Sequence, residues 1–251
     1  MAESISPYVV RPNDLATLRG HFDAALGGEN RFVLLEAPLG GGKRVAVAEL
    51  LRTAPVGEDL LSIRAAMTED MDGMKALMAL YAGLCAPLYR DPTLRGKVEV
   101  ILNAQLPQHP KRVQGWFTVF IDGLKKNIPQ PGADKMQLAV PADNPLVAFV
   151  EIVAAISKKL TTVLDIQNIH VVHSVGLFAA LDGLIQDRKQ GKLLAIFGTE
   201  SIDEAAKGWM PAPWLDLAER RAADLARVTM TLWTAEDVTA YAASRAVTVA
   251  N

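Results

Sequence analysis

Apolar residues fall along the chain in two patterns, short continuous runs and runs at helical spacing, and the two patterns alternate. The short runs predict strands at 32–36, 60–64, 161–167, 192–197 and 228–232. The helically spaced segments predict helices at 14–26, 45–54, 74–85, 145–160, 174–190, 214–226 and 234–245. We expect Asn13 to cap the first helix and the third helix to end before Pro87. Strands separated by helices are typical of a parallel sheet, so the sequence predicts a three-layer α/β fold with a mostly parallel sheet of about five strands.

The segment at 91–144 breaks this alternation. Prolines punctuate it at 92, 107, 110, 129, 131 and 141, so we expect an irregular, insertion-like region. An amphipathic stretch at 112–128 carries large apolar side chains on one face, and we expect this stripe to join the core rather than bind a ligand. Its members are Trp116, Phe117, Phe120 and Leu124. The stretch at 132–144 fits either a short strand or a loop.

Composition narrows the class of protein. Half of the 251 residues are hydrophobic, which is enough for a continuous core and argues against a disordered chain. The net charge of −2 gives no overall attraction to nucleic acid or to an anionic membrane. The single cysteine, Cys85, excludes an internal disulfide and is expected to be a small core residue. No secretory signal and no uninterrupted apolar span is present, so we expect a soluble, cytoplasmic protein.

A glycine-rich loop, Ala37-Pro38-Leu39-Gly40-Gly41-Gly42-Lys43-Arg44, follows the first predicted strand and precedes a helix. The P-loop pattern G-x-x-x-x-G-K-S/T occupies the same place, and Gly42 and Lys43 match it. In a P-loop, backbone N–H groups surround a phosphate and the lysine contacts the outer phosphates. We therefore expect Gly40, Gly41, Gly42, Lys43 and Arg44 to bind phosphate. The alternative is a tight turn with a solvent-facing lysine.

Two residues of this loop depart from the P-loop pattern. Ala37 stands where the first glycine is expected, and Arg44 stands where a Ser or Thr hydroxyl normally binds Mg²⁺. A guanidinium at that position pairs well with phosphate and repels a divalent cation. The sequence thus predicts a phosphate loop that does not need a metal ion.

The segment from Tyr8 to Leu51 resembles the start of the AAA-like signal-transduction NTPases. This family, the STAND group, lies near the origin-recognition type of AAA+ ATPases. The segment reads YVVRPNDLATLRGHFDAALGGENRFVLLEAPLGGGKRVAVAELL. The family has an F-V-G-R-E-x-E-L-like helix there, followed by a strand and G-E-A-G-I-G-K-S. Arg11 and Leu15 match the opening, whereas its usual glycine and glutamate are absent.

Later segments extend the resemblance. TVLDIQNIHVVHSVGL is similar to the family's V-L-V-L-D-D-L-H-W-A-D-P-A-S-L, with Ile169, His170 and Leu177 at matching positions. KLLAIFGTES resembles the strand that ends in G-T-Y-R, which places Gly198 and Thr199 at the sensor-1 position. VTMTLWTAEDVTAYAASR resembles the last core strand and the first lid helix.

The resemblance implies a domain organisation and a ligand. Residues 1–232 would form a P-loop NTPase core, with 91–144 as an insertion, and 233–251 would begin a truncated lid domain. ATP or ADP would lie on the glycine-rich loop, with the adenine near Tyr8–Arg11. Members of this family act as switches or assembly modules, so protein partners or self-association are implied.

Hydrolysis in this class needs a strand-end Asp for the Mg²⁺ shell and an adjacent acid that orients the attacking water. The ungapped alignment places Gln167 and Asn168 at these two positions. A register two residues earlier uses Asp165 as the first acid, but Ile166 then replaces the second. Because an amide neither takes a proton nor supplies charge to a metal, we expect weak or no hydrolysis and little dependence on Mg²⁺.

Other polar residues near the predicted strand ends have alternative interpretations. Asp165 either contacts a metal or bonds to neighbouring backbone or to the loop lysine. His170 and His173 lack the carboxylate or cysteine that would complete a metal site, so we expect surface histidines. Arg220 and Arg221 lie where related AAA+ proteins carry an arginine that reaches a neighbour's nucleotide, but we favour a solvated helix face.

Two function hypotheses therefore stand. The first is a nucleotide-binding switch or assembly module with slow or no hydrolysis, favoured by Gly42, Lys43 and Thr199. The second is a nucleotide-free scaffold for protein interaction, favoured by Pro38 and Arg44. An active ATPase ranks third.

Overall fold

A computed structural model describes residues 12–54, 59–126, 138–186, 190–203, 206–232, 234–239 and 243. The strands in this part of the chain are β1 (Arg31–Glu36), β2 (Leu60–Ala66), β3 (Thr161–Gln167), β4 (Leu193–Thr199) and β5 (Leu225–Thr229). They form one sheet in the order β2-β3-β4-β1-β5, and every neighbouring pair is parallel. The predicted α/β class with a parallel sheet is therefore confirmed.

Burial distinguishes the inner strands from the edge strands. Every residue of β3 and β4 is buried, and so is every residue of β1 except its first. On the edge strand β2, only alternate residues are buried, namely Leu61, Ile63 and Ala65. This difference follows from helices covering both faces, since an inner strand then has no solvent-facing side.

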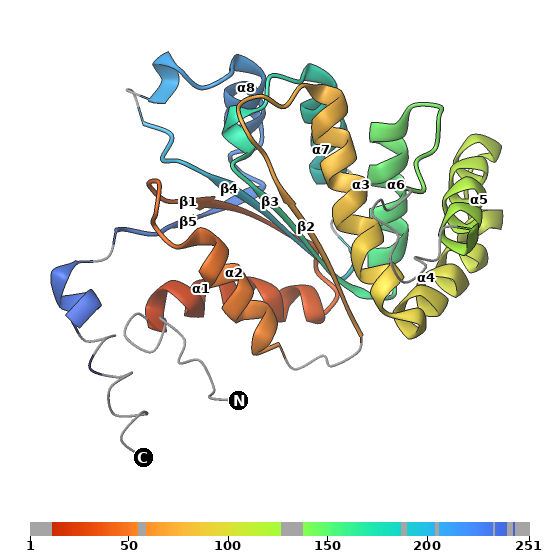
Figure 1. Cartoon of the computed structure of the whole chain (residues 1–251), viewed down its shortest axis with the longest axis horizontal. Coiled ribbons are helices and arrows are strands. Elements are labelled where there is room, and N and C mark those ends of the chain that lie inside the picture. Colours follow the sequence, from red (N-terminus) through yellow and green to blue (C-terminus); the bar gives the residue numbers. More distant parts are fainter. Residues whose placement is uncertain are drawn as a thin grey trace, which may run out of the picture.

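Helices cover the two faces of the sheet unequally (Figure 1). On one face lie α1 (Pro12–Leu26) and α2 (Lys43–Arg52). On the other lie α3 (Gly73–Arg90), α6 (Pro145–Ser157), α7 (Val175–Gln186) and α8 (Ala212–Arg220). Short 3₁₀ helices occur at η2 (Leu106–Gln108), η3 (Ile169–Val171) and η4 (Ala206–Gly208). Each face of the sheet has its own hydrophobic core, and alternate residues of β1 pack into the two. Phe32 and Leu34 belong to the larger core, and Val33 and Leu35 to the smaller.

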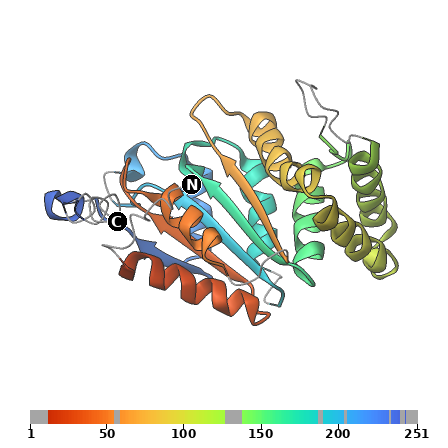
Figure 2. The same ribbon diagram turned by 60° about the horizontal axis from the view of Figure 1, so that its bottom comes forward.

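The region predicted to be irregular contains two regular helices, which is a correction. Helices α4 (Pro92–Gln105) and α5 (Lys111–Lys126) pack beyond α3 and α6, on the β2 side of the sheet (Figure 2). Pro92 is the first residue of α4 and Pro110 immediately precedes α5, positions that suit proline because a helix start needs no N–H donor. The predicted apolar stripe is confirmed as core: Trp116, Phe117, Phe120 and Leu124 are all buried.

Two helix boundaries differ from the prediction. Helix α3 continues through Pro87 to Arg90, because the residues on either side, Leu84 and Leu88, are fully buried in the core. Helix α1 begins at Pro12, so Asn13 lies inside the helix rather than at its cap.

The end of the described fold also differs from the prediction. The last strand is 225–229 instead of 228–232, because its pairing with β1 starts at Leu225, opposite Phe32. The preceding helix accordingly ends at Arg220. Residues 132–137 lie outside the described part of the chain, and 138–144 form neither helix nor strand.

The connections that follow β1 and β4 diverge at the carboxyl edge of the sheet. These strands are neighbours, with Glu36 opposite Thr199 at their ends. Helix α2 follows β1 onto one face, whereas η4 and α8 follow β4 onto the other (Figure 1). In doubly wound sheets, ligands bind where adjacent connections diverge in this way.

Candidate functional site

The glycine-rich loop follows β1 at this point of divergence. Its first residue, Ala37, donates a backbone hydrogen bond to Thr199 O over 3.1 Å, which holds the loop against the end of β4. Gly40 and Gly42 have φ angles of 79° and 83°, in the left-handed region that favours glycine. At Gly41, an added Cβ would lie 2.8 Å from the Ala37 Cβ, so this position also needs glycine. The three glycines are therefore required by the backbone path.

Lys43 is the first residue of α2 and is buried, with 8% of its surface exposed. Its ammonium donates hydrogen bonds to the backbone oxygens of Ala37, at 2.6 Å, and Pro38, at 3.4 Å. Burial lowers the pKa of Lys43, and the nearby Glu200 carboxylate partly opposes that shift. The alternative of a solvent-facing lysine is therefore wrong: Lys43 lies folded back inside its own loop.

A cavity of about 400 Å³ opens beside the loop. Residues 39–45 form one side of it, and Gln167 and Asn168 from the end of β3 form the other. Leu39 and Arg44 are exposed, so the cavity has an apolar and a cationic side chain near its mouth. The structure thus brings the loop together with two of the three strand-end candidates.

The third strand-end candidate, Asp165, does not line this cavity. It is 1% exposed, forms an ion pair with Arg64 of β2 at 3.3 Å, and accepts a hydrogen bond from the Gln167 side-chain amide. Burial raises the pKa of Asp165, while the Gln167 hydrogen bond, Arg64 and Arg44 act in the opposite direction. The expected bond from Asp165 to Lys43 or to neighbouring backbone is replaced by side-chain partners on β2 and β3.

Two polar atoms near the strand ends lack hydrogen-bond partners. Gln167 Oε1 and Thr199 Oγ1 are buried and unsatisfied within the described part of the structure. Gln167 lies against Gly198, where even a Cβ would collide with its amide oxygen. Since buried polar groups normally find partners, these two atoms are suited to a water or ligand atom. Asn168 adopts a left-handed backbone conformation with φ of 56°, which asparagine tolerates better than most residues.

His170 was expected at the surface, and that expectation is wrong. The residue is 3% exposed, and its ring packs edge-on against Trp209, with ring centroids 5.6 Å apart. The backbone N–H of Glu200 donates to His170 Nδ1 at 3.4 Å, and the Glu200 carboxylate lies 3.9 Å from Nε2. Burial, followed by the charge of Lys43, lowers the pKa of His170 to about 4. His170 is therefore neutral near pH 7.

The other candidates lie elsewhere in the fold. His173 is exposed, as expected, and Cys85 is a buried core residue whose pKa is raised by burial to about 11. Arg220 and Arg221 do not form a simple solvated face, because both form ion pairs with Asp182 of α7, at 3.3 Å and 2.5 Å. Tyr8–Arg11 lie outside the described residues.

Three site residues were not singled out from the sequence: Arg64, Glu200 and Glu36. Glu36 is buried at the end of β1, where it accepts a hydrogen bond from the Ile202 backbone at 3.3 Å and lies 3.8 Å from Arg227. It therefore ties the loop after β4 to the strand that carries the glycine-rich loop. Glu36 could have been found from the sequence, because it is an acidic residue at the end of an apolar strand. No local sequence pattern points to Arg64 or Glu200.

The described residues include neither a cluster of metal ligands nor a membrane-spanning helix. Among the described side chains, no three His, Cys, Asp or Glu residues gather closely enough to hold a metal ion. None of the described helices combines the length and the apolar character needed to cross a lipid bilayer. Comparison of the chain with protein-family models, with curated proteins and with solved structures finds no match.

Proposed function

We propose that the protein binds ATP or ADP through the glycine-rich loop and acts as a nucleotide-dependent switch or assembly module with slow or no hydrolysis. One observation carries the proposal: a strand–loop–helix unit places its glycine-rich turn and Lys43 beside a cavity at the carboxyl edge of a parallel sheet. This is where phosphates bind in α/β proteins, since backbone N–H groups and the helix start both favour an anion. The cavity volume of about 400 Å³ lies within the range of small-molecule sites.

The donors around the loop suit a phosphate. Lys43 is held by the Ala37 and Pro38 carbonyl oxygens, and a phosphate oxygen would compete with these as the acceptor of its protons. Arg44 adds a second cation at the exposed mouth of the cavity. Charge-assisted hydrogen bonds of this type are about twice as strong as neutral ones.

The same residues do not suit Mg²⁺. Position 44 presents a guanidinium instead of a hydroxyl, and the strand end presents the amides Gln167 and Asn168 to the cavity. The strand carboxylate Asp165 is engaged by Arg64 and Gln167. Mg²⁺ prefers carboxylate and phosphate oxygens, so we propose nucleotide binding without a protein-bound metal.

The proposal is tested by measuring the affinity of a fluorescent ATP analogue for the wild-type protein, Lys43→Met and Lys158→Met. Loss of the Lys43 ammonium is expected to weaken binding by about 1–2 kcal/mol, the scale of a charge-assisted hydrogen bond. Lys158 is an exposed lysine that follows α6, so its substitution controls for the change in net charge. Equal affinities for the two variants would place the nucleotide elsewhere.

A nucleotide-free scaffold is the second candidate. Its supporting observation is that Lys43 is already bonded within its own loop, which makes the loop self-sufficient without a ligand. Absence of analogue binding to the wild-type protein at millimolar concentrations would favour this candidate over the first.

A further inference from the structure

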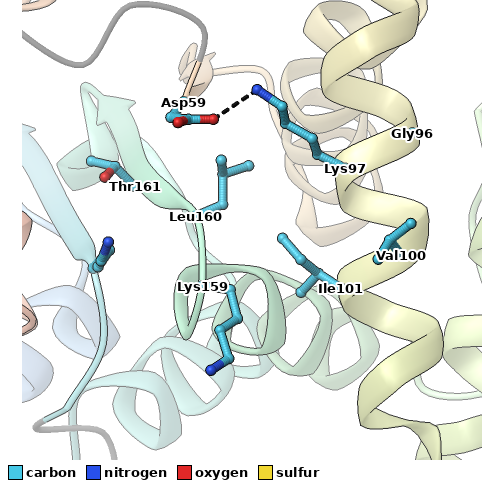
Figure 3. A pocket seen from close by; sticks show the side chains of 9 residues that line it. Asp59, Gly96, Lys97, Val100, Ile101, Lys159, Leu160 and Thr161 are labelled. Carbon is cyan, nitrogen blue, oxygen red and sulfur yellow. Dashed lines mark hydrogen bonds and ion pairs between the residues drawn. The ribbon is translucent and has the colours of Figure 1, made fainter.

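A second cavity of about 400 Å³ lies at the opposite, amino edge of the sheet. Its walls come from the starts of β2 and β3, from the residue before β4, and from one side of α4 (Figure 3). The lining residues are Asp59, Gly96, Lys97, Val100, Ile101, Lys159, Leu160, Thr161 and Lys192. Because parallel strands all run the same way, this cavity and the glycine-rich loop lie at opposite edges of the sheet. It is therefore separate from the proposed nucleotide site.

The lining combines an apolar centre with a cationic rim. Figure 3 shows Leu160 and Ile101 between Lys97 on one side and Lys159 on the other. Lys97 is bonded to Asp59, with 2.7 Å between the ammonium and the carboxylate. With Lys192, three ammonium groups face one carboxylate, so the lining carries a formal excess of positive charge.

The backbone holds this arrangement in place. Lys192 N donates to Ser157 O over 2.7 Å, which ties the start of β4 to the end of α6. Lys159 N bonds to Ile156 O at 3.1 Å, just before β3 begins. The two lysines therefore project from segments that are bonded to the same helix end. Opposite them, a Cβ added to Gly96 would meet no atom within 4 Å, so the α4 wall borders open space there.

We propose that this cavity, which we call the amino-edge site, binds a small organic anion with an apolar body. The body would rest on Leu160 and Ile101, and the anionic group would reach the ammonium groups at the rim. The lysine ammonium is a point charge on a flexible stem, so it pairs with either a carboxylate or a phosphate ester. Both head groups therefore belong to this class of ligand. A purely inorganic anion would leave the apolar centre exposed to water and gain nothing from it. The proposal is independent of nucleotide binding.

The test is a titration of the isotope-labelled full chain, followed by nuclear magnetic resonance. The probes are two aryl anions, phenyl phosphate and phenylacetate. Inorganic phosphate, which lacks the apolar body, and benzyl alcohol, which lacks the charge, are the two controls. Saturable shifts of the Gly96 and Thr161 amides are expected for an aryl anion, with a Kd below about 1 mM. Shifts at Gly40 and Gly41 would instead report the glycine-rich loop, so the two sites are read separately. The aryl anion that binds more tightly identifies the head group.

Variants of the charged rim give effects of opposite sign. Lys159→Met and Lys192→Met should each weaken binding by roughly twofold to fivefold, as expected for an exposed and a half-buried charge. Asp59→Asn should strengthen binding, because it removes the carboxylate that competes for Lys97. The adjacent Lys158→Met, outside the cavity, is the matched control and should change nothing. Saturable binding of benzyl alcohol or inorganic phosphate as tight as that of both aryl anions would overturn the proposal, as would unchanged affinity in Asp59→Asn.

Discussion

His170 is buried against Trp209 and Glu200, and this burial links the stability of the protein to pH. Its pKa is about 4 in the folded protein, against 6.5 for an unperturbed histidine. As the pH falls below 6.5, the unfolded chain takes up a proton that the folded protein does not bind. The free energy of unfolding should therefore fall by about 2–3 kcal/mol between pH 7 and pH 4 through this residue.

Denaturant unfolding at several pH values measures this effect in the wild-type protein, His170→Gln and His173→Gln. The first variant keeps a hydrogen-bond acceptor near Glu200 but cannot titrate, so its stability should depend less on pH. His173 is exposed, and its variant should retain the wild-type slope. An unchanged slope in His170→Gln would contradict the prediction.

Two glycines inside helices differ in the space available for a side chain. An added Cβ at Gly83 in α3 would lie 2.5 Å from the Arg64 carbonyl oxygen, whereas at Gly183 in α7 it would meet nothing within 4 Å. Gly83→Ala should therefore destabilise the fold by about 1–3 kcal/mol through overpacking of α3 on β2. Gly183→Ala should stabilise it by about 0.5–1 kcal/mol, the helix propensity of alanine over glycine. Chemical unfolding of both variants checks the pair, and a loss of stability in Gly183→Ala would contradict the open space around that residue.

At the scale of elements, α4 depends on its N-cap. The Asp91 side chain accepts a hydrogen bond from the Leu94 backbone over 3.0 Å, and Pro92 occupies the first helical position. Asp91→Ala should lower the free energy of unfolding by about 1 kcal/mol, while Asp91→Asn retains an acceptor and should cost only a fraction of that. Thermal unfolding compares the two variants. Equal losses would mean that the Asp91 charge matters more than its hydrogen bond.

Prolines explain why α4 and α5 were not predicted. A proline is read from sequence as a break, but Pro92 is the first residue of α4 and Pro110 immediately precedes α5. Asp91, followed directly by Pro92, is a helix-start pattern that the spacing of prolines concealed. Pro87 shows the reverse case, since burial of its neighbours in the core overrides its local preference to end α3.

For the whole molecule, the proposed nucleotide site leads to a prediction about metal dependence. A ligand that binds only the folded state raises Tm, and the rise grows with the logarithm of its concentration divided by its Kd. With Arg44 at the mouth of the cavity and Asp165 bonded to Arg64, ATP should raise Tm equally in Mg²⁺ and in a chelator. Differential scanning fluorimetry in the two buffers measures this. A rise in Tm that appears only with Mg²⁺ would contradict a metal-independent site.

Phosphate release provides a second whole-molecule test. Release from ATP should remain near background, because the strand end offers amides rather than an acid at Gln167 and Asn168. Turnover on the order of 1 s⁻¹ that is lost in Lys43→Met would be ordinary for an enzyme and would contradict slow hydrolysis. The substitution Gln167→Asp is a poor route to activity, because it places a second carboxylate beside buried Asp165.

The sequence by itself determined the features that depend on neighbouring residues. The apolar runs of β1, β3 and β4 are local patterns, and so is the strand–loop–helix unit that presents Gly40 to Lys43. The same holds for the apolar face of α5. These patterns sufficed for the α/β class, for the parallel sheet and for the position of the candidate phosphate loop.

Only the tertiary structure decided which of these residues meet. Asp165 pairs with Arg64 because β2 and β3 are neighbours, although 101 residues separate the two in sequence. His170 is buried because the loop after β4 and Trp209 fold over it, and the amino-edge site exists because α4 lies beside the starts of three strands. The strand order β2-β3-β4-β1-β5 brings these segments together, and periodicity within one segment carries no information about its neighbours in the sheet.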